Sequence, residues 1–426
     1  MKNLFSLFVM LLCANTVAAQ TTFEDFCSDL NKSGGVYYSY PTPANVCTQT
    51  PEGFKPFYIS HYGRHGSRYL LSRSNYEYPL EILERAEKNG CLTSVGERVL
   101  GHVRKISADA DMRFGDLTGI GVEQHRGIAE RMYRNYPGVF VNGRNVSART
   151  TMVHRCAMSM AAFCDKLKEL SPKLNFEFEM SERNMEYLNF SSQKSRQFSN
   201  TKTGPWVEEY RKFEEAHVNG NRLCSVLFDD SEFVRCVVNP SRIMKSLYQI
   251  AVDMQDCSPE INLLELFTPQ ELFDLWQCGN LNFYLRHANS AQGKGIVVAD
   301  EIPLLENIVS SADSAIANPE IAATLRFGHD TVVVPLLAAL QIEDFDVSVS
   351  NPEEVYRHWT DFKASPMAAN IQIVFYKNKK GEVLCKFLHN EHEVHVPVET
   401  DSWPYYEWQK VRSFCKKRIE TLKQDI

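Results

Sequence analysis

Strand and helix patterns alternate in both outer parts of this chain, and the middle part interrupts them. Short apolar runs such as 57–60 and 323–327 are typical of buried strands, and apolar residues at helical spacing follow each of them. Between residues 171 and 289 the chain is rich in Phe, Tyr and charge, with few strand-like runs. This order predicts one α/β core, a mostly parallel sheet flanked by helices, into which a smaller α-helical cap is inserted.

The chain has 426 residues, more than one compact domain usually holds, so we expect two domains. Residues 20–170 and 290–426 would form the two parts of the α/β core, and 171–289 the cap. The elements expected are strands at 57–60, 139–141, 146–148, 323–327, 371–376 and 383–388, and helices at 76–88, 121–136, 156–170, 302–317, 331–340 and 406–422.

The first 19 residues have the pattern of a cleavable secretory signal peptide: Lys2, an apolar run, and a small-residue ending at Ala19. No later stretch is long and apolar enough to insert stably in a membrane, so we expect a secreted or periplasmic protein. Cleavage removes Lys2 and no acid, which changes the formal net charge from −7 to −8. A nucleic-acid-binding protein would be basic, so nucleic acid is excluded as a partner.

The cysteine count suggests disulfides. Of the 12 cysteines, loss of Cys13 leaves 11, and most cysteines of an exported protein are paired. Cys27 and Cys47 would fix an irregular arm at 20–55. Cys156 and Cys164 lie about two turns apart on an expected helix and cannot bond to each other.

A basic motif, SHYGRHGSRY at 60–69, begins where the first expected strand ends. It places Arg64 and Arg68 on either side of His65. Strand ends are where α/β proteins bind ligands, and guanidinium groups beside a histidine suit a phosphate group. The alternative is a chance basic cluster on a loop, which the position after a strand disfavours.

A second candidate is Arg155. The segment VSARTTMVHR at 146–155 places Arg149 and Arg155 beyond a strand end and at a helix start. Helix N-termini favour anions, and an arginine strengthens that preference. A surface arginine in a salt bridge is the alternative.

The third candidate is the pair His329 and Asp330, which follows one expected strand and precedes a helix. Such a pair can offer a phosphate ligand and a proton donor. Alone the signal is weak, because Asp330 could simply cap the helix that begins at Thr331.

The three sites occupy equivalent strand-to-helix junctions of one sheet, so we expect them to converge. The imidazole of His65 can attack phosphorus and hold the phosphoryl group as a phosphohistidine. The arginines and His329 would stabilise the charge on the phosphoryl oxygens. Asp330 would protonate the leaving oxygen and then deprotonate the attacking water, without a metal or another cofactor.

These segments resemble the histidine acid phosphatases. The resemblance rests on RHGSR at 64–68, VSARTTMVHRCAMSMAAF at 146–163 and FGHD at 327–330, and it continues through LTGIGVEQHRGIAERMYRNYP at 117–137. FGHDTVVVPLLAAL and RHGSRYLLS look most like the multiple inositol polyphosphate phosphatase branch, which includes secreted phytases. The resemblance runs along most of the chain and is weakest in the insert.

The resemblance implies roles for individual residues. His65 would be the nucleophile and Asp330 the proton donor, and the phosphate ligands would be Arg64, Arg68, Arg155 and His329. The chain departs from the family in two places. The polyphosphate branch often has His-Ala-Glu where this chain has His329-Asp330-Thr331, and His154 stands where relatives often have an acid.

Two further groups of residues could bind a ligand, the first a distal phosphate and the second a metal ion. Distal phosphates of a substrate could be held by Arg73, Lys194, Arg196 and Lys202, although for any one of them a solvated surface is the favoured alternative. His389, His392 and His395 invite a metal hypothesis. Because strand residues alternate between faces, His389 and His392 would point in opposite directions on one strand, so we expect no metal site there.

The sequence therefore predicts a secreted phosphomonoesterase that binds a small phosphorylated molecule, with an inositol polyphosphate such as phytate as the expected substrate. A broad-specificity acid phosphatase is the nearest alternative. A mutase or phosphotransferase is disfavoured by export, and a catalytically inactive binding protein by the complete set of site residues.

Overall fold

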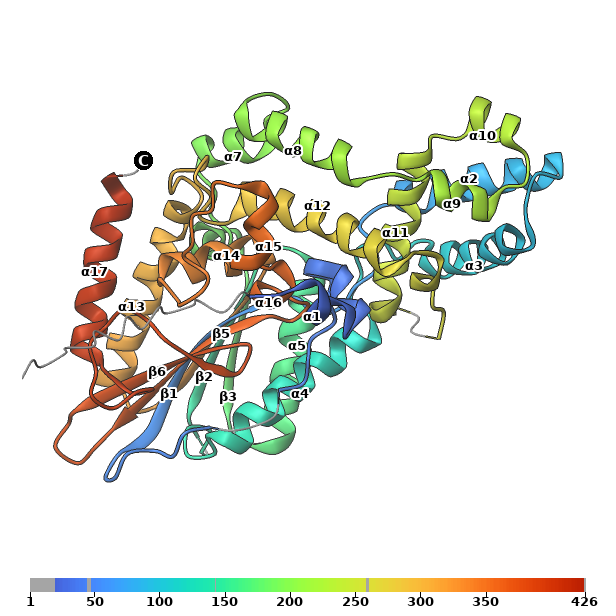
Figure 1. Ribbon diagram of the computed structural model, residues 1–426. Helices are drawn as coiled ribbons and strands as arrows, with labels where there is room; N and C mark the ends of the chain where they lie inside the picture. The colour runs from blue at the N-terminus through green and yellow to red at the C-terminus, as the bar shows by residue number, and fades with distance from the viewer. Residues whose placement is uncertain (1–19, 44–46, 142, 258–259, 425–426) are drawn as a thin grey trace, which may run out of the picture.

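The computed structural model describes residues 20–43, 47–141, 143–257 and 260–424, so the expected signal peptide lies outside the described residues. Its centre is a sheet in the order β3-β2-β4-β1-β5-β6-β7, with β8 paired to β6 (Figure 1). Strands β3, β2, β4 and β1 are parallel neighbours, and β5 to β8 pair antiparallel. The strands are β1 Lys55–Arg64, β2 Asn145–Thr150, β3 Asn175–Met180, β4 Ile321–Gly328, β5 Asn370–Lys377, β6 Val383–His389, β7 His392–Val394 and β8 Tyr406–Glu407.

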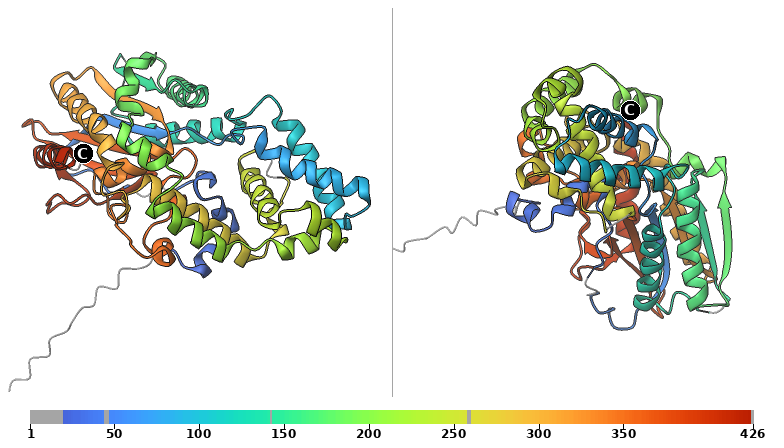
Figure 2. Two further views of the ribbon diagram at one scale, coloured as in Figure 1. Left: turned by 90° about the horizontal axis from the view of Figure 1, so that it is seen from above. Right: turned by 90° about the vertical axis from the view of Figure 1, so that its right-hand side faces the viewer.

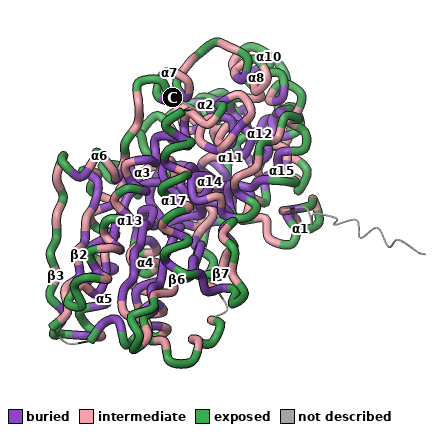
Figure 3. Tube along the Cα trace, turned by 90° about the vertical axis from the view of Figure 1, so that its left-hand side faces the viewer, coloured by how far each residue is buried: buried purple, intermediate pink, exposed green. Residues whose placement is uncertain are grey.

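Helices cover both faces of this sheet, which confirms the predicted α/β class. Helices α4 (Gly119–Asn135) and α5 (His154–Leu170) pack against each other on one face, and apolar residues such as Phe163 fill the space beneath them. On the other face lie α13 (Ile302–Ala317), α14 (Asp330–Ala339) and α17 (Trp408–Gln424). Buried segments run through the interior of these layers, and exposed ones lie at the periphery (Figure 3).

A second group of helices lies beside the sheet (Figure 2). Helix α2 (Ser74–Asn89) packs on α3 (Ser94–Ala110) and on α11 (Pro240–Cys257). Helices α2 and α3 precede the expected insert at 171–289 and α11 belongs to it, so this group contains helices from both parts of the chain. The remaining helices are α1 Phe23–Cys27, α6 Met185–Leu188, α7 Gln193–Asn200, α8 Pro205–His217, α9 Asn221–Leu227, α10 Ser231–Val237, α12 Pro269–His287, α15 Val355–His358 and α16 Asp361–Ala364, with 3-10 turns η1 Leu30–Tyr37, η2 Glu182–Asn184, η3 Leu264–Leu266, η4 Val298–Glu301 and η5 Pro352–Glu354.

Several expected elements need correction. The first residues of the range 171–289, expected to be helical, form β3, which pairs with β2 and so belongs to the sheet. Residues 139–141, expected as a strand, form a turn that buries Val139 and Phe140. The arm at 20–55 contains α1 and η1. The division of the chain into core and cap stays a prediction.

The disulfide expectation is not met. Each of the 11 cysteines within the described residues is a free thiol, including Cys27 and Cys47 of the arm, and most are buried. A buried thiol behaves as a small apolar side chain, so the buried cysteines contribute to the core through packing. Within the described residues, no helix is long and apolar enough to cross a membrane.

Candidate active site

The site forms where two neighbouring parallel strands end. The last residue of β1, Arg64, is in register with the last residue of β4, Gly328. The loops after them therefore start side by side, and the His65 amide donates to the Gly328 carbonyl at 3.0 Å. A side chain at position 328 would collide with the hydroxyl of Tyr62, because a Cβ there would lie 2.0 Å from it. Glycine at position 328 thus leaves room for the Tyr62 side chain, whose hydroxyl donates to the Leu188 carbonyl at 2.8 Å.

Strand β2 brings Arg155 to the same edge. It is parallel to β4, and the Thr151 amide just beyond it donates to the Phe327 carbonyl at 3.1 Å. Helix α5 begins at His154, so Arg155 lies in its first turn. The Thr151 hydroxyl is 3.2 Å from Nε2 of His329, which ties this junction to the end of β4. The three junctions predicted from the sequence therefore meet at one place.

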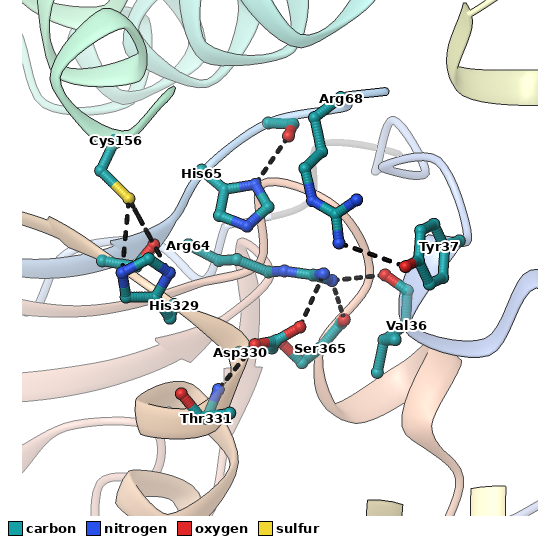
Figure 4. A network of polar contacts seen from close by, with 12 residues as sticks. Val36, Tyr37, Arg64, His65, Arg68, Cys156, His329, Asp330, Thr331 and Ser365 are labelled. Carbon is teal, nitrogen blue, oxygen red and sulfur yellow. Dashed lines mark hydrogen bonds and ion pairs between the residues drawn. The ribbon is translucent and has the colours of Figure 1, made fainter. Parts of the chain in front are cut away.

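His65 lies at the centre of this cluster (Figure 4). His65 is 2% exposed, and the centroid of its ring lies 5.8 Å from that of His329. Nδ1 is 2.9 Å from the Gly66 carbonyl oxygen, which can only accept, so Nδ1 carries the proton and donates. Burial, and then the charges of Arg64, Arg68 and Arg155, lower the pKa of His65 well below 6.5. The ring is therefore neutral, with a free electron pair on Nε2.

Arg64 is held on its outer edge. Its Nη1 donates to the carbonyls of Val36 and, at 2.7 Å, Ser365, and its Nη2 lies 2.7 Å from Oδ2 of Asp330 (Figure 4). Arg68 donates through Nη1 to the Tyr69 carbonyl at 2.9 Å. These contacts engage the terminal nitrogens of both guanidinium groups and leave Nε of each without a partner among the described residues.

Donors without partners mark the interior of the cluster. In the described residues, Nε of Arg64, Arg68 and Arg155 is buried in each case and has no hydrogen-bond partner. Burying an unpaired donor on a charged group is costly, and three guanidinium groups close together also repel each other. An anion with several oxygens would satisfy both needs, so the arrangement suits a phosphate group.

The two residues at the start of α14 differ in charge. Burial is the main reason that the pKa of His329 falls to about 4, so this ring is neutral. Burial alone would raise the pKa of Asp330, but the charges of Arg64 and Arg68 outweigh it and hold the pKa below its usual value. Oδ1 of Asp330 accepts from the Thr331 amide at 2.9 Å. Asp330 is thus a carboxylate paired with Arg64 while the site is free of phosphate.

The residues proposed for distal phosphates lie on the surface. Arg73 forms an ion pair with Asp111, and Arg196 donates to the Ser191 carbonyl. Lys194 and Lys202 are exposed. The structure also separates Arg149 from the cluster, because Arg149 pairs with Glu177 and Glu179.

The structure also shows the surroundings of His154, His389 and His392. His154 is exposed and lies 2.9 Å from Asp116. His389 and His392 lie on two strands and not on one. Residues 390 and 391 form a turn, and the two histidines are paired between β6 and β7. Among the described residues, no group of three or more His, Cys, Asp or Glu is placed to hold a metal ion.

Several contacts of the cluster carry no signal in the sequence. Val36 and Ser365 supply only backbone carbonyls to Arg64, from 28 residues before it and 301 after it. Tyr37 receives a hydrogen bond from Nη2 of Arg68 at 3.3 Å. His287, near the end of α12, lies close enough to Asp330 for the charges of the two groups to interact.

Comparison with known proteins gives one family. The model of the histidine phosphatase superfamily (branch 2) matches residues 63–391. No curated protein sequence matches the chain.

Solved structures share the fold. The multiple inositol polyphosphate phosphatase of Bifidobacterium longum, in complex with phosphate, is 18% identical, with a TM-score of 0.74 over 91% of this chain and 98% of that one. The phytase of D. castellii is 14% identical, with a TM-score of 0.66 over 92% and 85% of the two chains. The phytase of Hafnia alvei is 12% identical, with a TM-score of 0.53 over 88% and 99%. At these identities the likeness establishes a common fold.

Proposed function

Because the chain belongs to the histidine phosphatase superfamily (branch 2), we propose that it hydrolyses phosphate monoesters through a phosphohistidine formed on His65. One observation carries the proposal. The free Nε2 of a neutral His65 lies among three arginines whose buried Nε donors have no partner in the described residues. A phosphoryl group bound by those donors would be held in front of the nucleophile.

In the first step, the electron pair on Nε2 of His65 attacks phosphorus, and the bond from phosphorus to the ester oxygen breaks. The leaving oxygen takes a proton from Asp330. In the second step, Asp330 removes a proton from water, the resulting hydroxide attacks phosphorus, and the phosphorus–nitrogen bond breaks. Inorganic phosphate is released, and His65 and Asp330 return to their starting states.

The ion pair between Arg64 and Asp330 bears on how Asp330 acquires its proton. In the free site the charge of Arg64 holds Asp330 ionised. A bound phosphate brings negative charge to the same guanidinium, which offsets its effect on Asp330 and raises the pKa of that carboxyl. A substrate bound as a monoanion supplies the proton itself, so the site can load its acid on binding.

We propose an inositol polyphosphate as the substrate. The family supports phosphate-ester chemistry, and proteins of the same fold include a multiple inositol polyphosphate phosphatase crystallised with inositol hexasulfate. The proposed distal contacts are Arg73, Lys194, Arg196 and Lys202.

We further propose that the protein is exported. The pattern of residues 1–19 predicts a mature protein that begins at Gln20, and N-terminal sequencing of the processed protein tests this.

The test of the function is phosphate release by the purified protein from phytate and from an aryl phosphate, each at matched concentration, with His65→Ala prepared in parallel. We expect the wild type to hydrolyse both substrates and His65→Ala to hydrolyse neither. Turnover of the aryl ester without phytate would replace the inositol polyphosphate proposal by a broad-specificity phosphatase. Equal activity of His65→Ala would overturn the mechanism.

A further inference from the structure

Two carboxyl groups lie buried behind the motif that carries His65. Asp253 and Asp256 belong to the last turn of α11, in the group of helices beside the sheet, and both are 0% exposed. Their charges interact with those of Arg68 and Arg64. Neither residue belongs to the three strand-to-helix junctions, so the mechanism above gives them no role.

Asp256 contacts the motif through Ser67. The Ser67 hydroxyl is hydrogen-bonded to Oδ1 of Asp256. The same oxygen of Ser67 accepts from Nε2 of Gln124 at 2.7 Å, and the Ser67 amide donates to Oε1 of Gln124 at 2.9 Å. A hydroxyl has one hydrogen, and the Gln124 nitrogen is a donor, so the hydrogen of Ser67 must go to Asp256.

Ser67 stands between the two groups whose placement matters most for phosphate chemistry. On one side, the Gly66 carbonyl accepts from Nδ1 of His65 and so sets the orientation of the ring. On the other side, Arg68 follows directly and carries one of the free Nε donors. A shift of Ser67 would therefore move both the nucleophile and a phosphate ligand.

The acid pair is poorly neutralised for a buried site. Oδ2 of Asp256 and Oδ1 of Asp253 have no hydrogen-bond partner in the described residues. Burial, and then the neighbouring charge of Asp253, raise the pKa of Asp256 well above its usual value. Two carboxylates this deeply buried cannot both stay ionised, so the pair retains a proton. Asp256 then serves as a hydrogen-bond acceptor more than as a counter-charge.

We propose that Asp256 is a positioning residue for the phosphatase reaction, which acts as the acceptor that fixes Ser67 and, through Ser67, the turn that carries His65 and Arg68. This inference rests on the proposed function, because it concerns the same nucleophile.

The test is a double-mutant cycle with Asp256→Ala, Ser67→Ala and the double variant, together with Asp256→Asn, which keeps an acceptor oxygen and the shape of the side chain. kcat and KM are measured on an aryl phosphate, the dissociation constant of inorganic phosphate by calorimetry, and folding by denaturant unfolding. Asp274→Asn removes a half-buried carboxyl from α12 and serves as the matched control.

If Asp256 acts through Ser67, each alanine variant loses about 10- to 100-fold in kcat/KM and binds phosphate more weakly, because a displacement near 1 Å is enough for such a loss. The double variant loses no more than the worse single variant, since both remove one interaction. Asp256→Asn recovers most of the loss. Asp274→Asn leaves the kinetics unchanged.

Additive losses in the double variant would overturn the inference, as would an Asp256→Asn enzyme as impaired as Asp256→Ala. So would variants that lose stability while the folded enzyme keeps its kcat and its phosphate affinity. If Asp256→Ala does not fold, Ser67→Ala and Asp256→Asn still decide, because the inference requires the first to be impaired more than the second. A wild-type protein that releases no phosphate contradicts the proposed function instead, and phosphate calorimetry on that protein separates the two failures.

Discussion

Arg64 and Asp330 form an ion pair, with 2.7 Å between Nη2 and Oδ2, that joins the end of β1 to the start of α14. The Arg64 side chain is fully buried, whereas that of Asp330 is 18% exposed. One group of the pair is a proposed phosphate ligand and the other is the proposed acid. If phosphate binds Arg64 as proposed, its negative charge would offset that of the guanidinium and raise the pKa of Asp330.

Asp330→Asn is expected to impair substrates according to their leaving groups. An alkyl leaving group such as an inositol hydroxyl needs a proton as it departs, so kcat should fall by about 10²- to 10⁴-fold. The leaving group of p-nitrophenyl phosphate is p-nitrophenolate, a stable anion that needs no proton, so hydrolysis of this substrate should be slowed much less. Steady-state kinetics on a series of aryl and alkyl phosphates checks this. Equal slowing across the series would mean that Asp330 does not act as the acid.

His65→Ala is expected to abolish turnover and to preserve the fold, since the substitution removes a ring that packs in a polar cluster outside the two apolar cores. Brief incubation of the wild type with labelled substrate and rapid denaturation should trap phosphate on the protein, in a form that acid releases. The His65→Ala protein should trap none. His358→Ala, at an exposed histidine of α15, is the control and should label like the wild type.

The pH dependence of kcat/KM should reflect the low pKa of His65. That quantity reports the free enzyme, in which burial and the three arginines keep His65 neutral far below pH 6.5. Protonation of His65 therefore causes no loss near pH 6.5, and kcat/KM should keep rising as the pH is lowered from 7 to 5, because a phosphate monoester takes up its second proton at about pH 6 and the monoanion brings the proton that Asp330 needs. A fall below pH 6.5 with a midpoint at that value would contradict a depressed pKa.

The part of the site that the sequence predicted depends on local pattern. Strand β1 and the motif after it are contiguous, so an apolar run that ends in arginines and a histidine indicates both the strand and the anion site. The same reasoning placed Arg155 and the start of α14 correctly, because parallel strands deliver their carboxyl ends to one edge.

The rest of the site could not be predicted because it is formed by residues far from the motif in the sequence. The carbonyls of Val36 and Ser365 have no side-chain signature, and only folding brings them to Arg64. Strand β3 was missed because it is an edge strand with both faces largely exposed, so its sequence NFEFEM lacks a buried run. Asp253 and Asp256 have the composition of a solvated helix end, yet the helix buries them against the motif.

Asp253 should make the stability of the protein depend on pH in a defined direction. Burial raises its pKa to about 7 in the folded protein, against 3.8 when unfolded. Between these values the folded state binds more protons than the unfolded state, so the free energy of unfolding falls as the pH rises from 4 to 7. For this one group the loss is at most about 4 kcal/mol, and above pH 7 it changes no further.

The substitution Asp253→Asn removes this titration, so the variant should gain stability relative to the wild type as the pH rises. Urea unfolding at pH 5 and at pH 8 measures the difference between the two proteins, and the exposed Asp401→Asn is the matched control. At pH 5 Asp253 is protonated in the folded wild type, and the amide differs little from it. At pH 8 the wild type contains a buried carboxylate that the variant lacks, and the variant should be the more stable by comparison. A difference between the proteins that is the same at both pH values would show that burial does not raise the pKa of Asp253 in the folded protein.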